Sequence, residues 1–286
     1  MNVILPEKEK INKKAVALYS ISILVCVISI IVLATSENLN GKTIDELIYE
    51  NTHQTSQDKI DEELLKAEFQ NLFQNKLEKS SEIEISDKKI HDEKEIIYTK
   101  YKFHETKENR YTVDIDIPYI NLDNEFAKKY NQEIEKIFVE KAKNVLQKEE
   151  GNAIYSVKYE ATREEYVLYL MIYSDLKENT SAQRVIIQTY QYDLEERKEI
   201  SLGELIDKKQ LDRKNIQEKI KKEIKEEQKK VEDLKALGYT IFERNVENDM
   251  YKIEFTEEFF VRDGKLYLIY AYGNDNLTSE LDVIII

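Results

Sequence analysis

The hydrophobic and polar positions of this chain change their spacing several times, and each spacing predicts a different kind of element. One run stands apart: the twenty residues 15–34 read AVALYSISILVCVISIIVLA and contain no charged side chain. At a rise of about 1.5 Å per residue, a helix of this length spans about 30 Å, the thickness of the hydrocarbon core of a bilayer. The pattern therefore predicts a transmembrane helix over 15–34.

Charged residues flank this run unevenly. The segment before it carries four lysines and two glutamates, whereas acids dominate the segment after it. A lysine bias on the amino side places residues 1–14 in the cytoplasm as a short tail and the rest of the chain outside the membrane. A cleaved secretory signal is the alternative, with Ala34 and Ser36 as the small residues of a candidate signal-peptidase region. The run exceeds the roughly 7–15 apolar residues of an ordinary signal core, so we favour a single-pass anchor in the cell membrane.

A polar region, residues 35–95, follows the anchor and is interpreted as a stalk or linker. Inside it, apolar residues recur at helical spacing over about 58–79, which predicts an amphipathic helix. These residues are Ile60, Leu64, Leu65, Phe69, Leu72, Phe73 and Leu77. The stretch that follows is again charged and poor in apolar residues. A folded domain is therefore expected to begin near residue 96.

Beyond residue 96, the pattern alternates between the period of strands and that of helices. Alternating apolar and polar residues predict strands over 96–103 and 110–120, and Pro118 is expected to end regular pairing in the second of them. Further strands are predicted at 154–161, 166–173, 184–194, 250–255, 259–261, 266–272 and 281–286, with a hairpin turn at Asp263-Gly264.

Two long helices are predicted among these strands. One begins at an N-cap, Asp123 or Asn124, and runs to about residue 149, and the other spans about 209–237. Most strands are joined by turns too short for crossover connections. The sequence thus predicts an α+β extracytoplasmic domain over 96–286, with a largely antiparallel sheet packed with two long helices and preceded by one transmembrane helix.

The net charge of the chain is more negative when the predicted anchor is left out. The formal net charge is −14, from 43 basic and 57 acidic residues. Residues 1–36 hold four of the bases and two of the acids, so residues 37–286 carry 39 bases and 55 acids, a net charge of −16. Such an acidic domain is not expected to bind nucleic acid, because phosphate neutralisation needs a basic face, and it attracts cationic partners. The alternative is that the acidity only keeps an exported protein soluble.

No catalytic or metal-binding constellation is recognisable in the sequence. The three histidines, His53, His91 and His104, are scattered, and the single Cys26 lies within the apolar run. The HExxH, GxSxG and paired CxxC motifs that position zinc or a nucleophile are missing. A glycosidase needs only two carboxylates, but any pair among 57 acids would be an arbitrary choice. We therefore predict a protein that is not an enzyme and uses no cofactor or metal, with an envelope hydrolase as the alternative.

Tyrosine is the unusual part of the composition. The chain has 19 Tyr, 9 Phe and no Trp, and many of the tyrosines fall in predicted strands. Tyrosine packs well on a half-buried strand, and it also brings a large amphipathic contact area to protein interfaces. The second interpretation gives a candidate partner-binding surface made of Tyr155, Tyr159, Tyr169, Tyr190, Tyr192, Tyr270 and Tyr272.

Several segments occur in the order of a known family. They are FAKKYNQEIEKIF from Phe126, YQYDLEERKEISLGELI from Tyr190 and FFVRDGKLYLIYAYG from Phe259. Through them, the chain from about residue 124 resembles the extracytoplasmic domain of RsiV-like anti-sigma-V factors, which also occurs in some peptidoglycan deacetylases of Firmicutes. The resemblance implies an α+β domain outside the membrane that binds lysozyme-like muramidases, which are commonly basic proteins.

The sequence departs from that family at three places. The turn at Lys177–Gln183 lacks the family's glycine and histidine, and the end from Asn274 lacks its proline and tyrosine. Residues 1–14 are too short to fold into a sigma-binding domain. We therefore predict a membrane-anchored extracytoplasmic binding or sensing module of the bacterial cell envelope, whose ligand is a basic muramidase or peptidoglycan. An anti-sigma-type regulator controlled by proteolysis is the alternative.

Overall fold

The computed structural model describes residues 62–79, 87–91, 95–239, 241–272 and 280–286, and Leu64–Ile286 form one structural unit. No helix in these ranges is long and apolar enough to cross a membrane. The predicted cytoplasmic tail, transmembrane helix and signal-peptidase region, including Ala34 and Ser36, lie outside the described residues and stay predictions.

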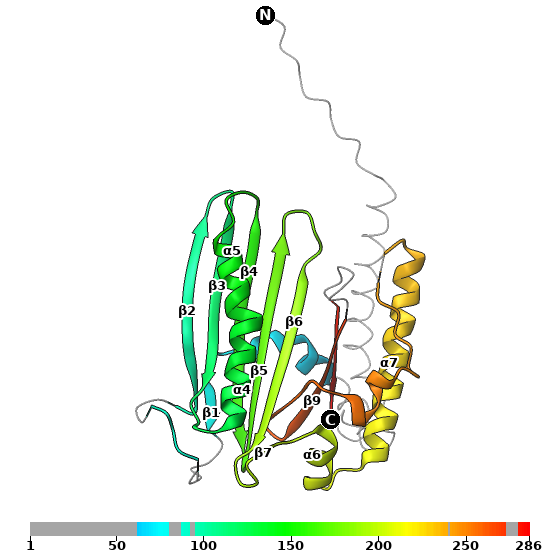
Figure 1. Ribbon diagram of the computed structural model, residues 1–286. Coiled ribbons are helices and arrows are strands. Elements are labelled where there is room, and N and C mark those ends of the chain that lie inside the picture. Colours follow the sequence, from blue (N-terminus) through cyan, green and yellow to red (C-terminus); the bar gives the residue numbers. More distant parts are fainter. Residues whose placement is uncertain (1–61, 80–86, 92–94, 240, 273–279) are drawn as a thin grey trace, which may run out of the picture. The chain divides into compact units, whose positions relative to one another are not determined.

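A mixed sheet of seven strands, counted over the described residues, forms the larger layer of this unit (Figure 1). Its strands are β1 (Leu77–Lys79), β2 (Ile97–Lys107), β3 (Tyr111–Ile120), β4 (Ala153–Glu164), β5 (Val167–Glu178), β6 (Arg184–Asp193) and β7 (Lys198–Glu199). The spatial order is β2-β3-β4-β5-β6-β7, and β1 lies beside β4. Neighbours are antiparallel except β3–β4 and β1–β4, which are parallel. The predicted α+β class with a largely antiparallel sheet is confirmed.

The connection from β3 to β4 is helical, as parallel neighbouring strands require. It consists of α4 (Glu125–Ile134), the π-helical segment η2 (Glu135–Val139) and α5 (Glu140–Leu146), which run along one face of the sheet (Figure 1). Asn124 caps α4, because its side chain accepts a hydrogen bond from the N–H of Ala127 at 2.8 Å. The first of the two predicted long helices is thus confirmed, and its apolar stripe packs on the sheet.

Pro118 does not end the pairing of β3, contrary to the prediction. The strand continues to Ile120, and Pro118 lies opposite Thr99, next to a bulge in β2. In an antiparallel pair, alternate residues point their backbone N–H and C=O toward the partner strand, and Pro118 is one of the residues that point away from β2, toward β4. The parallel pairing of β3 with β4 ends at Ile115. Pro118 therefore breaks no hydrogen bond between strands, although it has no N–H to donate.

The helix predicted over 58–79 is shorter in the structure, where residues 58–61 lie outside the described part. Helical structure ends at residue 67, a 3-10 turn η1 (Phe69–Leu72) follows, and the chain then enters β1. Asn75, with φ of 57°, redirects the chain, since asparagine tolerates the left-handed region. Its side-chain oxygen accepts a hydrogen bond from the N–H of Tyr159 at 3.1 Å. The described residues 64–79 thus belong to the same structural unit as the large sheet.

The second layer is a three-stranded sheet in the order β10-β9-β8, counted over the described residues. Its elements and those around it are β8 (Phe259–Arg262), β9 (Lys265–Ala271), β10 (Leu281–Ile285), α6 (Leu202–Lys208), α7 (Arg213–Ala236), η3 (Asp249–Tyr251) and η4 (Ile253–Phe255). The hairpin at Asp263-Gly264 is confirmed, with positive φ at both residues. The second long helix is confirmed as α7, although its first predicted residues form the turn after α6.

The strand predicted over 250–255 is wrong, because this stretch forms the 3-10 turns η3 and η4. A glutamine of α7 makes hydrogen bonds to the backbone groups of this stretch. The side-chain amide of Gln217 donates to the carbonyl of Tyr251 at 2.8 Å, and its oxygen accepts from the N–H of Ile253 at 3.1 Å. These tertiary hydrogen bonds replace those that a neighbouring strand would have supplied.

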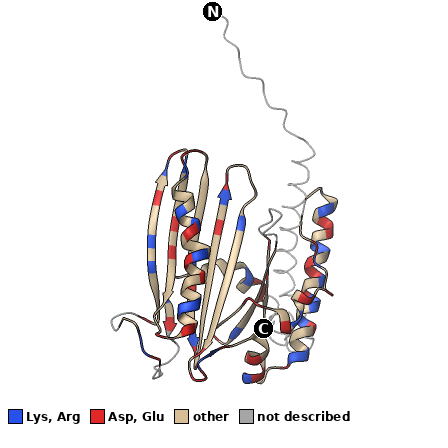
Figure 2. Ribbon diagram, viewed as in Figure 1, with Lys and Arg blue, Asp and Glu red and all other residues tan. Residues whose placement is uncertain are grey.

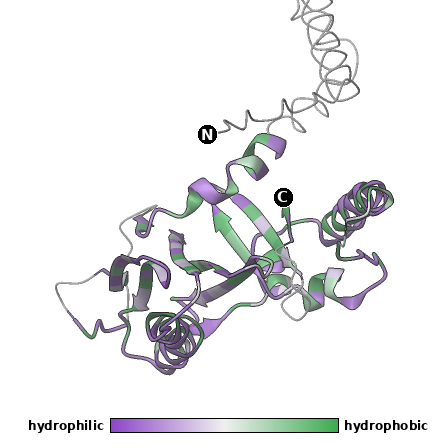
Figure 3. Cartoon of the chain, turned by 90° about the horizontal axis from the view of Figure 1, so that it is seen from above, coloured by the Kyte–Doolittle hydropathy of each residue, from purple (hydrophilic) through white to green (hydrophobic). Residues whose placement is uncertain are grey.

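Two hydrophobic cores lie on opposite faces of the large sheet. One packs the sheet against α4 and α5, and the other packs it against β8, β9, β10, α6 and α7. β5 belongs to both, because Leu168, Leu170 and Ile172 face the first core while Tyr169 and Met171 face the second. Seen from above, hydrophobic colouring is concentrated on the strands, and the helices are hydrophilic on their outer faces (Figure 3).

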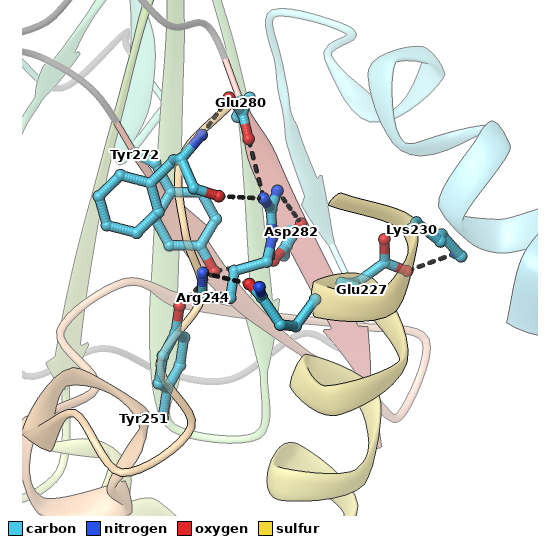
Figure 4. Close-up of polar contacts among 9 residues, drawn as sticks. Glu227, Lys230, Arg244, Tyr251, Tyr272, Glu280 and Asp282 are labelled. Atoms are coloured by element: carbon cyan, nitrogen blue, oxygen red, sulfur yellow. Dashed lines mark hydrogen bonds and ion pairs between the residues drawn. The ribbon is translucent and has the colours of Figure 1, made fainter. Parts of the chain in front are cut away.

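A buried arginine fastens the segment after α7 to β10 (Figure 4). Arg244 donates from Nε and Nη2 to the two carboxylate oxygens of Asp282 at 2.7 and 3.0 Å, and from Nη1 to Glu280 at 2.8 Å. The side chain of Arg244 is 6% exposed and that of Asp282 is 7% exposed. The hydroxyl of Tyr272 donates to Asp282 at 2.8 Å, and that of Tyr251 donates to Tyr272 at 3.0 Å.

Candidate binding groove

A groove of about 870 Å³ lies along the outer edge of β6, where the chain turns into α6. Its floor is Gln188–Gln191 of β6. One wall is α4, which packs on one face of the large sheet, and the opposite wall is residues 253–259, which pack on the other face. Residues 201–204, at the start of α6, also line the groove. No described strand pairs with the edge of β6 beside these residues, because β7 pairs only with Tyr192 and Asp193.

Acidic side chains dominate this groove. It is lined by the acids Glu133, Glu199, Glu204, Asp207, Glu254, Glu257 and Glu258 and by the bases Lys129 and Arg213. Seven acids and two bases give a formal charge of −5. Figure 2 shows acidic positions along both α4 and α6. The groove thus concentrates the negative charge of the domain at one hollow, where it raises the local concentration of cations.

Three of the seven acids are not neutralised by a neighbouring base. Ion pairs join Lys129 to Glu199 at 2.8 Å, Arg213 to Asp207 at 3.2 Å and to Glu254 at 3.1 Å, and Lys198 to Glu204 at 3.1 Å. Glu133, Glu257 and Glu258 form no ion pair with any residue that the structure describes. The charges of Glu133 and Glu257 are therefore available to a ligand, and that of Glu258 depends on pH near neutrality, because burial raises its pKa to about 7.

Glu258 occupies the position that a neighbouring strand would take at the edge of β6. Its carboxylate accepts hydrogen bonds from the side-chain amide of Gln188 at 2.8 Å and from the backbone N–H of Thr189 at 2.6 Å. Burial raises the pKa of Glu258 to about 7, and the hydrogen bonds from Thr189 oppose this rise. Glu258 therefore changes its charge near neutral pH.

This pKa gives a testable dependence of stability on pH. The folded-state pKa of Glu258 lies above the ordinary value of 4.5, so the unfolded chain ionises first as the pH rises. The contribution of neutral Glu258 to stability is therefore complete below about pH 4.5 and is lost between about pH 4.5 and 7, by at most about 3 kcal/mol. In urea unfolding at several pH values, Glu258→Gln should lose this part of the pH dependence. A difference between wild type and variant that stays constant from pH 4.5 to 7 would contradict the assignment.

Tyr190 brings an unpaired hydroxyl to the α4 side of the groove. Its ring lies 4.3 Å from the ring of Tyr130, centroid to centroid. The residue is 3% exposed, and its hydroxyl has no hydrogen-bond partner among the described residues. Burial raises the pKa of Tyr190, and the nearby charges of Glu133 and Glu258 add to the rise. A buried polar group without a partner costs free energy, so this hydroxyl lowers the stability of the folded unit.

The predicted tyrosine surface is wrong for all seven residues. Tyr155, Tyr159, Tyr169, Tyr190, Tyr192, Tyr270 and Tyr272 are each 3% exposed or less. The sheet is covered on one face by α4 and α5 and on the other by the second layer, so both faces of the central strands are core. In five of the seven the hydroxyl reaches a polar neighbour, as Tyr155 reaches the carbonyl of Phe138 at 3.2 Å, whereas the hydroxyls of Tyr169 and Tyr190 have no partner among the described residues. Tyr190 alone of the seven lines the groove.

The acids of the groove could not be singled out in the sequence. Glu133 lies on a helix, and Glu257 and Glu258 lie just before a strand more than a hundred residues later. The only signal was the net charge of −16 over residues 37–286. That charge indicated a cationic partner but not the place where it binds.

The histidines do not gather in the structure. His104 is exposed, with Nδ1 3.6 Å from a carboxylate oxygen of Asp114, and His53 lies outside the described residues. Within the described part of the chain, no three His, Cys, Asp or Glu side chains are arranged to hold a metal ion. That the protein is not an enzyme stays a prediction.

Comparison with solved structures finds similarity to two proteins described as members of the DUF3298 family. No family model matches the chain, and no curated protein matches it. A DUF3298 family protein of Pseudomonas aeruginosa PAO1 is 14% identical, with a TM-score of 0.37 over 71% of this chain and 90% of that chain. A second DUF3298 member, from Bacteroides fragilis, is 12% identical, with a TM-score of 0.31 over 61% of this chain and 81% of that chain. At these TM-scores, neither likeness carries an argument about function.

Proposed function

We propose that this chain is a membrane-anchored, extracytoplasmic binding or sensing module of the bacterial cell envelope that recognises a basic protein of the lysozyme-like muramidase type. The acidic groove carries the proposal, since it holds Glu133, Glu257 and Glu258 without any basic partner in the described part of the chain. Complementary charge steers a cationic protein to such a hollow and fixes its orientation there. The placement outside the membrane rests on the apolar run over 15–34 and the lysines before it.

The anti-sigma alternative concerns other residues. It requires residues 1–14 to bind a sigma factor and a cut near Ala34 or Ser36, and all of these lie outside the described residues. No observation on the folded unit favours it over a binding module. Binding of a sigma factor by residues 1–14 would support the anti-sigma alternative.

The proposal is tested with the full chain in detergent micelles and a basic lysozyme as the probe. Binding is expected at low ionic strength and should weaken about tenfold or more between roughly 20 and 300 mM salt, because exposed charges are screened. The double variant Glu133→Lys/Glu257→Lys should weaken binding at low salt by a further tenfold or more, since it reverses two uncompensated charges in the groove.

A matched control carries the same change in net charge elsewhere. Glu226 and Asp233 are exposed on α7 and do not line the groove. Glu226→Lys/Asp233→Lys should retain at least about a third of the wild-type affinity, because only the long-range field changes. No binding at low salt would overturn the proposal, and so would an equal loss in the two double variants.

A further inference from the structure

We infer that the ligand enters the acidic groove as an extended basic segment, which adds to the free edge of β6 as a further strand. The inference deepens the proposed function and rests on it, because it names the part of a basic protein that the groove holds. Strand addition takes its affinity from main-chain hydrogen bonds and its specificity from alternate side chains.

The edge of β6 presents backbone groups that no other strand uses. Alternate residues of β6 direct their N–H and C=O toward β5, as the hydrogen bond from the N–H of Leu194 to the carbonyl of Tyr166 shows for this register. Val185, Ile187, Thr189, Gln191 and Asp193 are therefore the residues whose backbone groups point away from β5. Thr189 and Gln191 line the groove, and Val185 and Ile187 lie further along the same edge, beyond its lining residues. No described residue hydrogen-bonds to the outward backbone groups of Val185 or Ile187.

β7 pairs with this edge of β6, but it is so short that no described strand pairs with the rest of the edge. β7 has two residues, which pair with Tyr192 and Asp193. The chain makes one more contact, from the N–H of Ile200 to the carbonyl of Gln191 at 3.4 Å, and then leaves the edge for α6 at its N-cap, Ser201. If β7 were longer, its next residues would lie beside Gln188–Gln191, which line the groove.

The charges around this place fit a basic segment on both faces of the sheet. Successive side chains of an added strand point to opposite faces. Toward one face they meet α4 with Glu133, and toward the other they meet Glu257 and Glu258. Lysine or arginine at consecutive positions can therefore pair with an uncompensated acid on either side.

Glu258 is placed to respond to such a strand. The carboxylate of Glu258 now holds the outward N–H of Thr189. An incoming carbonyl can take over that N–H and free Glu258 to pair with a basic side chain.

The experiment uses the full chain in detergent micelles and two isomeric, capped octapeptides of sequence KKVVKKVV, which places lysines on both faces of an extended strand. Each peptide carries four N-methyl groups, on alternate residues in one and on four consecutive central residues in the other. Alternate methylation leaves one edge of an extended peptide able to pair, whereas consecutive methylation blocks both edges without changing charge or composition. The alternately methylated peptide should bind about tenfold or more tightly than its isomer. It should also slow amide hydrogen exchange at Val185 and Ile187, and Glu133→Lys/Glu257→Lys should weaken it while Glu226→Lys/Asp233→Lys does not.

Equal affinities of the two isomers would overturn the added strand, and so would unchanged exchange at Val185 and Ile187. If lysozyme still bound in a groove-dependent way, the proposed function would stand without this binding mode. If neither the peptides nor lysozyme bound, both the binding mode and the proposed function would fall.

Discussion

Replacing Arg244 by leucine is expected to lower the free energy of unfolding by about 3–5 kcal/mol, the usual cost of removing one partner from a buried ion pair. Asp282 is 7% exposed and, among the described residues, would keep only the hydroxyl of Tyr272, at 2.8 Å, as a donor for its carboxylate. Glu280 would lose its contact with the guanidinium at 2.8 Å as well. The loss therefore comes from an uncompensated buried charge more than from the contact itself.

The measurement is urea unfolding of the folded unit, followed by circular dichroism. An exposed pair, Lys235 with Glu243, provides the control, and Glu243→Gln should change the free energy of unfolding by no more than about 0.5 kcal/mol. The double variant Arg244→Leu/Asp282→Leu should be more stable than Arg244→Leu alone, because it removes the stranded carboxylate. A loss in Arg244→Leu no larger than in the control would contradict the buried network of Figure 4.

Tyr169→Ala is expected to cost about 3–5 kcal/mol, as for other large buried side chains that leave a cavity. Tyr169 is 0% exposed and packs in the second core, where its ring lies 6.3 Å from that of Phe260. Tyr166 is 41% exposed, and Tyr166→Ala should cost about 1 kcal/mol or less. The pair is compared by urea unfolding.

The hydroxyl group of Tyr169 gives a second, opposite expectation. It is buried without a hydrogen-bond partner among the described residues. Tyr169→Phe removes only this oxygen and should leave stability unchanged or raise it by about 1 kcal/mol. Tyr155→Phe, which loses a hydrogen bond to the carbonyl of Phe138, should instead lower stability by about 1 kcal/mol. Destabilisation in both phenylalanine variants would contradict the unpaired state of Tyr169.

Much of the fold could be predicted from local pattern because the elements are long and strongly periodic. The helix that begins at Asn124 has both a cap and an apolar stripe, and the hairpin at Asp263-Gly264 has residues that tolerate positive φ. The failures lie where a distant residue decides the local structure. Gln217 holds residues 251–253 out of a strand, and Asn75 turns the chain because Tyr159 needs a backbone partner.

The same reason explains why the groove was not predicted. Alternating tyrosines in a strand indicate one buried and one exposed face, but they do not say whether a second layer covers the exposed one. Here it does, and the candidate surface became core. Two acids of the groove, Glu133 and Glu258, come together only because both line the hollow at the edge of β6. A single sequence contains no pattern that pairs a residue of α4 with a residue just before β8.

β5 is buried on both faces, so the two layers of the unit share one strand. Leu170 belongs to the core under α4 and α5, and its neighbour Met171 belongs to the core under the second layer. Loosening either layer therefore exposes one side of a strand on which the other layer depends. The two cores are thermodynamically linked through this shared strand, so the layers lose their structure together, as one cooperative unit rather than as two independent ones.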